Sequence, residues 1–200
     1  MSGFVRHRRS GLLIATFNAF EAELLRSLAG QIIELLQDGE AIPIEPQDPL
    51  ERLFAFDGPI HEPDDPVLIR LLPSAYPDDA EASGEFRRFT ESGLREGKVG
   101  TAVTVLDALR LAGLVDGPPR SDATTDVTLE TYDVELSPTE AVDWLKSLTD
   151  FRLAIAARLG VEEDGDLDRE FDREDPRAPA VEIYHWLSFV QETLVRALRR

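Results

Sequence analysis

Residues 137–140, Ser-Pro-Thr-Glu, mark a helix start more clearly than any other segment of the chain. A serine side chain caps free backbone N–H groups, proline fits the first helical position, and the glutamate can return a hydrogen bond to the serine backbone. Apolar residues then follow at helical spacing as far as Gly160, which is a natural helix end. The predicted stripe consists of Val142, Leu145, Leu148, Arg152, Ile155 and Leu159, with Trp144 and Phe151 beside it.

The same periodicity recurs elsewhere and predicts a mostly helical chain. Asn18 and Glu21 form a second capping-box pattern, and the helix that follows is expected to end at Gly39. Its expected buried stripe is Phe20, Leu24, Leu28, Ile32 or Ile33, and Leu36. The last helix, 178–200, is expected to bury Tyr184, Leu187, Gln191, Leu194 or Val195, and Leu198.

Proline and glycine divide the middle of the chain. An Asp-Pro pair predicts a short helix over 67–75. A helical pattern then begins at Asp79, and Gly93 and Gly97 predict a break before the next helix, 98–111. The expected stripe of that next helix is Val99, Val103, Leu106 and Leu109, and Gly113 follows its end.

Three short segments have the composition of strands. Residues 4–8 and 11–17 predict a β-hairpin, and the run 127–136, rich in Val, Thr and Tyr, predicts a strand that pairs with it. Proline-rich residues 40–66 and acidic residues 161–177 are expected to be connectors. The predicted fold class is α+β, mostly α, with five or six helices and a small antiparallel sheet.

Length and charge limit the classes of function. The chain fits a single domain, residues 1–200, that needs no metal or disulfide to fold. Thirty-nine acidic residues against 21 basic residues give a formal net charge of -18, which disfavours non-specific nucleic-acid binding by the whole chain. There is no cysteine, and no segment approaches the apolar length of a membrane span. The apolar run after Arg8 and Arg9 is too short for an export signal, so we expect a cytoplasmic protein.

The acidic segment EEDGDLDREFDREDP, residues 162–176, partly matches a calcium-binding EF-hand loop. When the count begins at Asp164, aspartates occupy the first three ligand positions. Position six, where the backbone needs glycine, is Arg169, and position twelve is Asp175 where a bidentate glutamate is usual. We therefore expect a hydrated connector, with calcium binding as the alternative.

Motifs of the common enzyme classes are absent from the sequence. It contains no HExxH, no G-x-S-x-G, no P-loop and no G-x-G-x-x-G. The three histidines, His7, His61 and His185, lack the spacing of zinc ligands. We expect no catalytic residues, no metal and no cofactor, and an enzyme of unrecognised type is the remaining alternative.

Basic side chains are the candidates for contact with a macromolecule. They gather on the N-terminal hairpin and around the predicted break, where region 80–113 could form a helix-turn-helix that reads DNA. Against that reading, Phe89 occupies a position where such motifs have a small residue, and helix 98–111 offers few cations. The candidate contacts for nucleic acid or a partner protein are Arg6, Arg8, Arg9, Arg87, Arg88, Arg95 and Lys98.

Arg152 interrupts the apolar stripe of its helix. A guanidinium is costly to bury unless it is paired. Two interpretations follow: either the side chain reaches water at the edge of the stripe, or it meets a carboxylate from another helix. We favour the first, because long charged side chains commonly extend their heads to water.

Four segments together resemble a known family. They are EAELLRSLAGQIIELL, DPVLIRLLPSAYPDDAEASGEFRRFTESGLREGKV, SPTEAVDWLKSLTDFRLAIAARLGV and VEIYHWLSFVQETLVRAL. Over nearly its whole length the chain resembles the actinobacterial family called domain of unknown function twenty-seventeen. The matching segments are packing patterns without reactive residues.

The resemblance implies an oxidative-stress transcription regulator. Genes of the family often neighbour those of a Clp-protease adaptor and of cysteine-biosynthesis proteins, and its redox sensing is attributed to paired cysteines. Because this chain has none, we expect no sensing by its own thiols. The expected function is that of a non-enzymatic regulator that contacts a protein of the transcription machinery, with direct DNA binding as the alternative.

Overall fold

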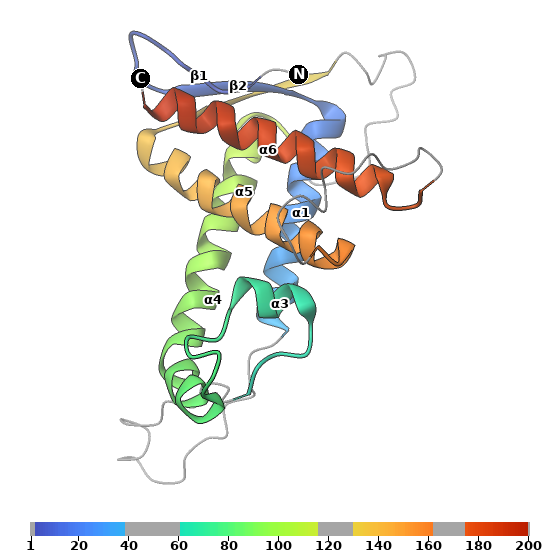
Figure 1. The fold of residues 1–200 in the computed structure, drawn as a ribbon. Helices are drawn as coiled ribbons and strands as arrows, with labels where there is room; N and C mark the ends of the chain where they lie inside the picture. Colours follow the sequence, from blue (N-terminus) through green and yellow to red (C-terminus); the bar gives the residue numbers. More distant parts are fainter. Residues whose placement is uncertain (1–2, 39–60, 116–129, 162–174, 200) are drawn as a thin grey trace.

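The computed structural model describes residues 3–38, 61–115, 130–161 and 175–199. Within these ranges five helices accompany a three-stranded antiparallel sheet, which confirms the predicted fold class. The sheet lies at one end of the molecule, and helices α1 and α4 run side by side away from it (Figure 1). None of the helices in the described ranges is long and apolar enough to cross a membrane.

The sheet joins the N-terminal hairpin to a strand from the second half of the chain. Its strands are β1 (Val5–Arg6), β2 (Leu13–Asn18) and β3 (Thr131–Leu136), in the order β1-β2-β3. Both pairings are antiparallel, with Val5 opposite Ile14 and Ile14 opposite Glu135. The predicted hairpin and its pairing with the third strand are therefore confirmed, although residues 127–129 lie outside the described ranges.

Helix α1 (Ala19–Gln37) begins with the predicted capping box, in which Asn18 and Glu21 exchange hydrogen bonds. Its buried face differs from the predicted stripe, because Phe20 is 72% exposed. α1 packs along α4, and alanines on the face turned inward allow that close approach. The buried side chains are Ala22, Leu25, Ala29, Ile32 and Leu36.

Helix α3 (Pro66–Leu71) has the predicted start, since the Asp65 side chain accepts a hydrogen bond from the Val67 N–H. It ends before the predicted Ala75. Leu72 precedes a proline and leaves the helical conformation, with φ -129° and ψ 61°.

Helix α4 (Ala80–Leu111) runs without interruption through Gly93 and Gly97. The predicted break is therefore wrong, and the helix-turn-helix proposed for 80–113 is not formed. Glycine weakens a helix by only about 1 kcal/mol, which packing and side-chain pairs across one turn can offset. The predicted end is confirmed, because Gly113 has φ 102° just after the last turn.

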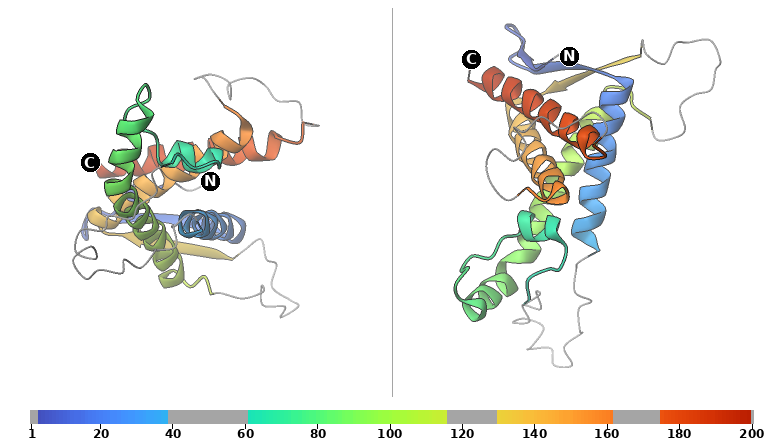
Figure 2. Two further views of the ribbon diagram at one scale, coloured as in Figure 1. Left: turned by 90° about the horizontal axis from the view of Figure 1, so that it is seen from below. Right: turned by 45° about the vertical axis from the view of Figure 1, so that its right-hand side comes forward.

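Helices α5 (Pro138–Leu159) and α6 (Ala178–Leu198) pack against each other, and α5 also packs across α4 (Figure 2). The predicted capping box of α5 and the left-handed Gly160 at its end are confirmed. The predicted stripes are shifted: Val142 is 44% exposed, and Tyr184 and Gln191 are only half-buried. The buried side chains are Ala141, Trp144, Ser147, Leu148, Asp150, Phe151 and Ala156 on α5, and Val181, Leu187, Val190, Leu194 and Ala197 on α6.

The centre of the core is an aromatic cluster beneath the sheet. Trp144 packs edge-on against Phe4, with ring centroids 5.6 Å apart, and stacks against Phe17 at 6.2 Å. All three side chains are buried. The sheet end is thus anchored in the core, whereas α3 and the first turns of α4 project beyond α5 and α6 (Figure 2).

Candidate functional site

The projecting part of the molecule combines a buried ion network with an exposed apolar surface. We call it the distal end: helix α3, the segment 72–79 and the first part of α4, residues 80–97 (Figure 1). The ion network lies on one face of α4, and the exposed apolar side chains of α4 lie on another.

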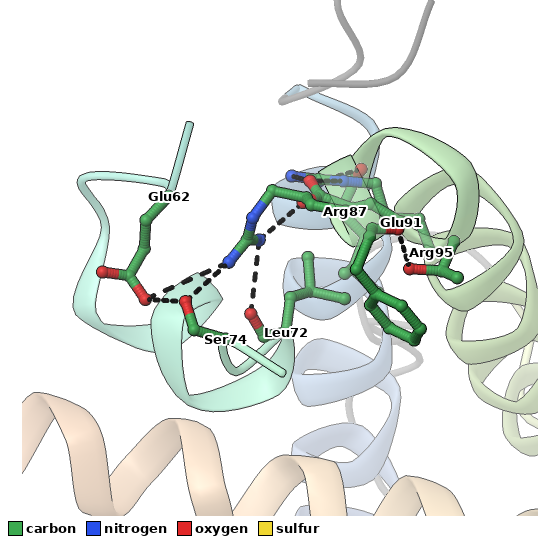
Figure 3. A network of polar contacts seen from close by, with 9 residues as sticks. Glu62, Leu72, Ser74, Arg87, Glu91 and Arg95 are labelled. Atoms are coloured by element: carbon green, nitrogen blue, oxygen red, sulfur yellow. Dashed lines mark hydrogen bonds and ion pairs between the residues drawn. The ribbon is translucent and has the colours of Figure 1, made fainter. Parts of the chain in front are cut away.

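Three charged side chains at successive i, i+4 positions form the buried network (Figure 3). Arg87, Glu91 and Arg95 are only 6%, 2% and 3% exposed. Arg87 Nη1 lies 2.6 Å from Glu91 Oε2, and Arg95 Nη2 lies 2.7 Å from Glu91 Oε1. Each oxygen of one carboxylate therefore has its own guanidinium, an arrangement that compensates the cost of burying the charges.

The two arginines also attach α4 to its neighbours. Arg87 donates hydrogen bonds to the Leu72 carbonyl at 3.4 Å and to Ser74 Oγ at 3.3 Å. Arg95 Nη1 donates to the Leu36 carbonyl at 2.7 Å, in the last turn of α1, where a cation is favourable. The network thus fixes the segment after α3 and the end of α1 to one helix.

Lys98 connects the same helix to α5. Its Nζ lies 2.7 Å from Asp150 Oδ1, and the Asp150 side chain is 7% exposed. Burial raises the pKa of the Asp150 carboxyl, and the hydrogen bond from Lys98 opposes that shift. Lys98 is therefore engaged within the fold.

These contacts correct the predicted basic surface around Gly93. Arg87 and Arg95 are not presented to a partner, because their guanidinium groups are buried and paired. Arg88 is half-buried, with its guanidinium 6.0 Å from the centroid of the Phe89 ring. A contact role for Arg88 stays a prediction.

The basic hairpin lies at the opposite end of the molecule. Arg6, Arg8 and Arg9 are exposed there, close to the C-terminal end of α6 (Figure 1). Gly11, with φ 75°, and a 2.8 Å hydrogen bond between His7 Nδ1 and Ser10 Oγ shape the turn between the strands. The role of the three arginines in contacting nucleic acid or a partner also stays a prediction.

Large apolar side chains are exposed at the distal end. Tyr76, Phe86 and Leu94 are 49%, 46% and 49% exposed, and Phe89 is 51% exposed. The Tyr76 and Phe86 rings meet edge to face at 6.1 Å. Ser83 Oγ accepts a hydrogen bond from the Tyr76 N–H and donates one to its carbonyl, so the backbone that carries Tyr76 is fixed to α4. This surface is consequently preformed.

A shallow hollow lies within this surface, open to solvent on one side. Its cavity volume of about 20 Å³ has room for about one water molecule and is far below the usual size of a small-molecule pocket. Its lining includes Leu72, Pro73, Phe86, Arg87, Thr90 and Leu94. The hollow is therefore part of the exposed surface and not an enclosed ligand site.

Four exposed carboxylates lie beside the apolar side chains, and those on α4 lie along one side of them. Asp78 and Glu81 lie at the start of α4, while Glu85 and Glu96 lie along its exposed side. None of the four forms an ion pair with another described residue. The surface therefore has an apolar centre and an acidic rim.

The described ranges contain no group of three or more His, Asp or Glu side chains that could hold a metal ion. The predicted calcium alternative concerns residues 162–174, which lie outside those ranges. Asp175, at their edge, accepts hydrogen bonds from the backbone and side chain of Arg177.

Arg152 follows neither sequence interpretation fully. Its guanidinium donates to Gln191 Oε1 at 2.7 Å and to the Tyr184 hydroxyl at 2.9 Å, both on α6. The guanidinium carbon also lies 4.8 Å from the centroid of the Tyr184 ring. The side chain is half-buried against neutral partners, so a carboxylate pair from another helix is not the explanation.

Sequence reasoning missed the apolar surface, because a helical pattern that begins at Asp79 does not show which of its apolar residues, such as Phe86 and Leu94, are exposed. The spacing of Arg87, Glu91 and Arg95 contained a usable signal. A glutamate between two arginines at i, i+4 spacing can pair with both, so that one face of the helix is buried although charged and the adjacent apolar face is left to solvent.

A family model described as "Domain of unknown function (DUF2017)" matches residues 1–198. The chain belongs to this family. The resemblance inferred from the sequence is thereby confirmed. No solved structure matches the chain.

Curated relatives of the chain come from mycobacteria. "Oxidative stress regulator AosR" of Mycobacterium tuberculosis (strain ATCC 25618 / H37Rv) and of Mycobacterium bovis is 32% identical over 190 residues, covering 89% of this chain and 78% of the relative. "Putative oxidative stress regulator AosR" of Mycobacterium leprae (strain TN) is 30% identical over 200 residues with the same coverage.

Proposed function

We propose that this chain is a non-enzymatic regulator of the oxidative-stress response that acts by binding another protein, a component of the transcription machinery. The observation that carries the proposal is the exposed apolar surface of the distal end, formed by Tyr76, Phe86 and Leu94. The names of its relatives, which are oxidative stress regulators, support the regulatory class.

The surface has the features of a protein interface. Interfaces have an apolar, often aromatic centre and a polar rim, and the distal end has both. The Ser83 hydrogen bonds and the buried network hold the surface in place. The loss of conformational entropy on binding is therefore small. The chain has no cysteine, so the proposed regulator does not sense oxidants through thiols of its own.

The test is affinity purification from native cell extract with matched surface variants. Wild-type protein should recover a partner that the double variant Phe86→Ser, Leu94→Ser loses, because each serine removes exposed apolar contact area. Phe20→Ser is the control, since Phe20 is 72% exposed on α1, outside the distal end. Equal recovery by all three proteins would refute the proposal.

Direct DNA binding is a second candidate, favoured by the exposed Arg6, Arg8 and Arg9 of the hairpin. A gel shift at physiological salt tests it. Sequence-specific binding by the isolated protein, lost when the three arginines are replaced by alanine, would give DNA contact priority over protein contact.

A further inference from the structure

One face of α4 carries three glycines that the fold does not require. Gly93, Gly97 and Gly100 lie on the same face as Phe86 and Thr104, because the spacings are three, four or seven residues. A Cβ atom added at any of the three glycines meets no described atom within 4 Å. Their φ angles are not positive. We call these five positions the outer face of α4.

Glycine weakens a helix relative to alanine, so three on one face need a reason outside the helix itself. Glycine is the residue that allows another backbone to approach closely. The face bears the exposed Phe86 at one end and continues past Thr104 to Leu111, which is 86% exposed. The length of this face and the apolar residues at its ends match a second helix laid along α4.

The charges beside this face indicate what kind of helix it accepts. Asp78, Glu81, Glu85 and Glu96 are exposed and form no ion pair with described residues. A partner with lysine or arginine beside its apolar stripe would complement them. A second copy of this chain would bring the same carboxylates and a net charge of -18, which disfavours self-association.

We propose that the outer face of α4 binds an amphipathic helix of another protein, with a narrow apolar stripe over Gly93, Gly97 and Gly100 and basic residues facing the acidic rim. This inference rests on the proposed function, because it names the chemical class of the partner that the distal end would recognise. Phe86 and Tyr76 would contact one end of that helix.

The probe is a displayed library of helical peptides that share an alanine and leucine stripe and differ in the charge of their flanking positions. Selection on the full chain should enrich lysine and arginine flanks. Enriched peptides should lose at least tenfold in affinity for the double variant Glu85→Lys, Glu96→Lys. Enrichment of acidic flanks, or of no peptide, would overturn the inference.

The glycine variants separate binding from folding. Gly97→Ala should raise the melting temperature, and Gly97→Leu should fold normally yet bind the enriched peptide at least tenfold more weakly, because its side chain occupies the approach path. Gly30→Leu on α1 is the matched control, since its added Cβ also meets no described atom within 4 Å. Unchanged peptide affinity in Gly97→Leu would overturn the inference.

Two further outcomes are distinguishable. If wild-type protein sediments as a dimer that Gly97→Leu dissociates, the occupant is a second copy and the proposed partner class is wrong. If the serine variants of Phe86 and Leu94 lose the partner recovered from extract while the glycine and charge variants retain it, the further inference fails and the proposed function stands.

Discussion

Glu91 is the residue on which the distal end depends most. Its carboxylate is 2% exposed and holds two buried guanidinium groups, one directed to the segment after α3 and the other to the end of α1. Buried pairs of this kind contribute little compared with a well-packed apolar core, but removing one partner leaves uncompensated charge. The network is therefore best tested at its centre.

Glu91→Gln should lower the free energy of unfolding by about 3–5 kcal/mol, because two buried arginines lose the carboxylate that each contacts most closely, and Glu62, at 4.0 Å from Arg87, is half exposed. Urea unfolding followed by circular dichroism measures the change. Glu96→Gln on the exposed side of the same helix is the control, with an expected change within about 0.5 kcal/mol. Equal stability of the two variants would contradict the structural role of Glu91.

Arg152→Leu should leave the chain folded, with a loss of about 1 kcal/mol. Its partners on α6 are a neutral amide and a neutral hydroxyl, both half-buried, so water can replace the lost hydrogen bonds. Thermal unfolding is the measurement. A collapse of folding would mean that the guanidinium compensates a buried negative charge.

At the scale of the elements, the first turn of α5 is the clearest case. Ser137→Ala should destabilise the protein by about 1 kcal/mol. The Ser137 hydroxyl accepts a hydrogen bond from the Glu140 N–H, and an alanine side chain has no acceptor for it. Chemical unfolding at neutral pH measures this loss. Thr139→Ala, which leaves the cap intact, is the control and should stay within about 0.5 kcal/mol of the wild type.

The same cap predicts a dependence on pH. Hydrogen bonds from the Ser137 side chain and backbone lower the pKa of Glu140 below its ordinary value of 4.5. A lowered folded-state pKa gives stability that is present above the unfolded pKa and is lost as the pH falls through the folded pKa. Between pH 5 and about pH 3, the free energy of unfolding should therefore fall less in Glu140→Gln than in the wild type. An equal fall in the two proteins would show that the Glu140 carboxyl does not contribute to the pH dependence of stability.

The elements that sequence could predict are those determined by local chemistry. The caps at Asn18, Asp65 and Ser137 and the left-handed Gly160 act within a few residues, so a pattern suffices to find them. The break at Gly93 was wrong because the packing of α4 against α1 and α5, which no local pattern contains, adds to the i, i+4 ion pairs of Glu91.

Buried faces were predicted less well than boundaries. Phe20 and Val142 belong to apolar stripes yet are exposed, since neighbouring small residues such as Ala22 and Ala141 allow tighter packing. The candidate contact residues show the same limit. The i, i+4 spacing of Arg87 and Arg95 around Glu91 is visible in the sequence. The carbonyl partners of the two arginines come from other segments and are brought to them only by the fold.

For the whole molecule, the two ends differ in which apolar side chains they bury. The sheet end contains the aromatic core of Phe4, Phe17 and Trp144, whereas the distal end exposes Tyr76, Phe86 and Leu94 around a shallow hollow. A stable end and a preformed apolar end are what a recognition protein needs, and the family's relatives are named as regulators. The proposal is therefore that the distal end makes the functional contact.

Site-specific photocrosslinking in the native cell examines that contact most directly. A photoreactive phenylalanine analogue at position 86 should form a covalent adduct with one protein of the transcription machinery, and the same analogue at position 20 should not. Both positions are exposed, at 46% and 72%, so accessibility to the crosslinker cannot explain the difference. Adduct formation at position 20 alone, or at neither position, would contradict the proposal.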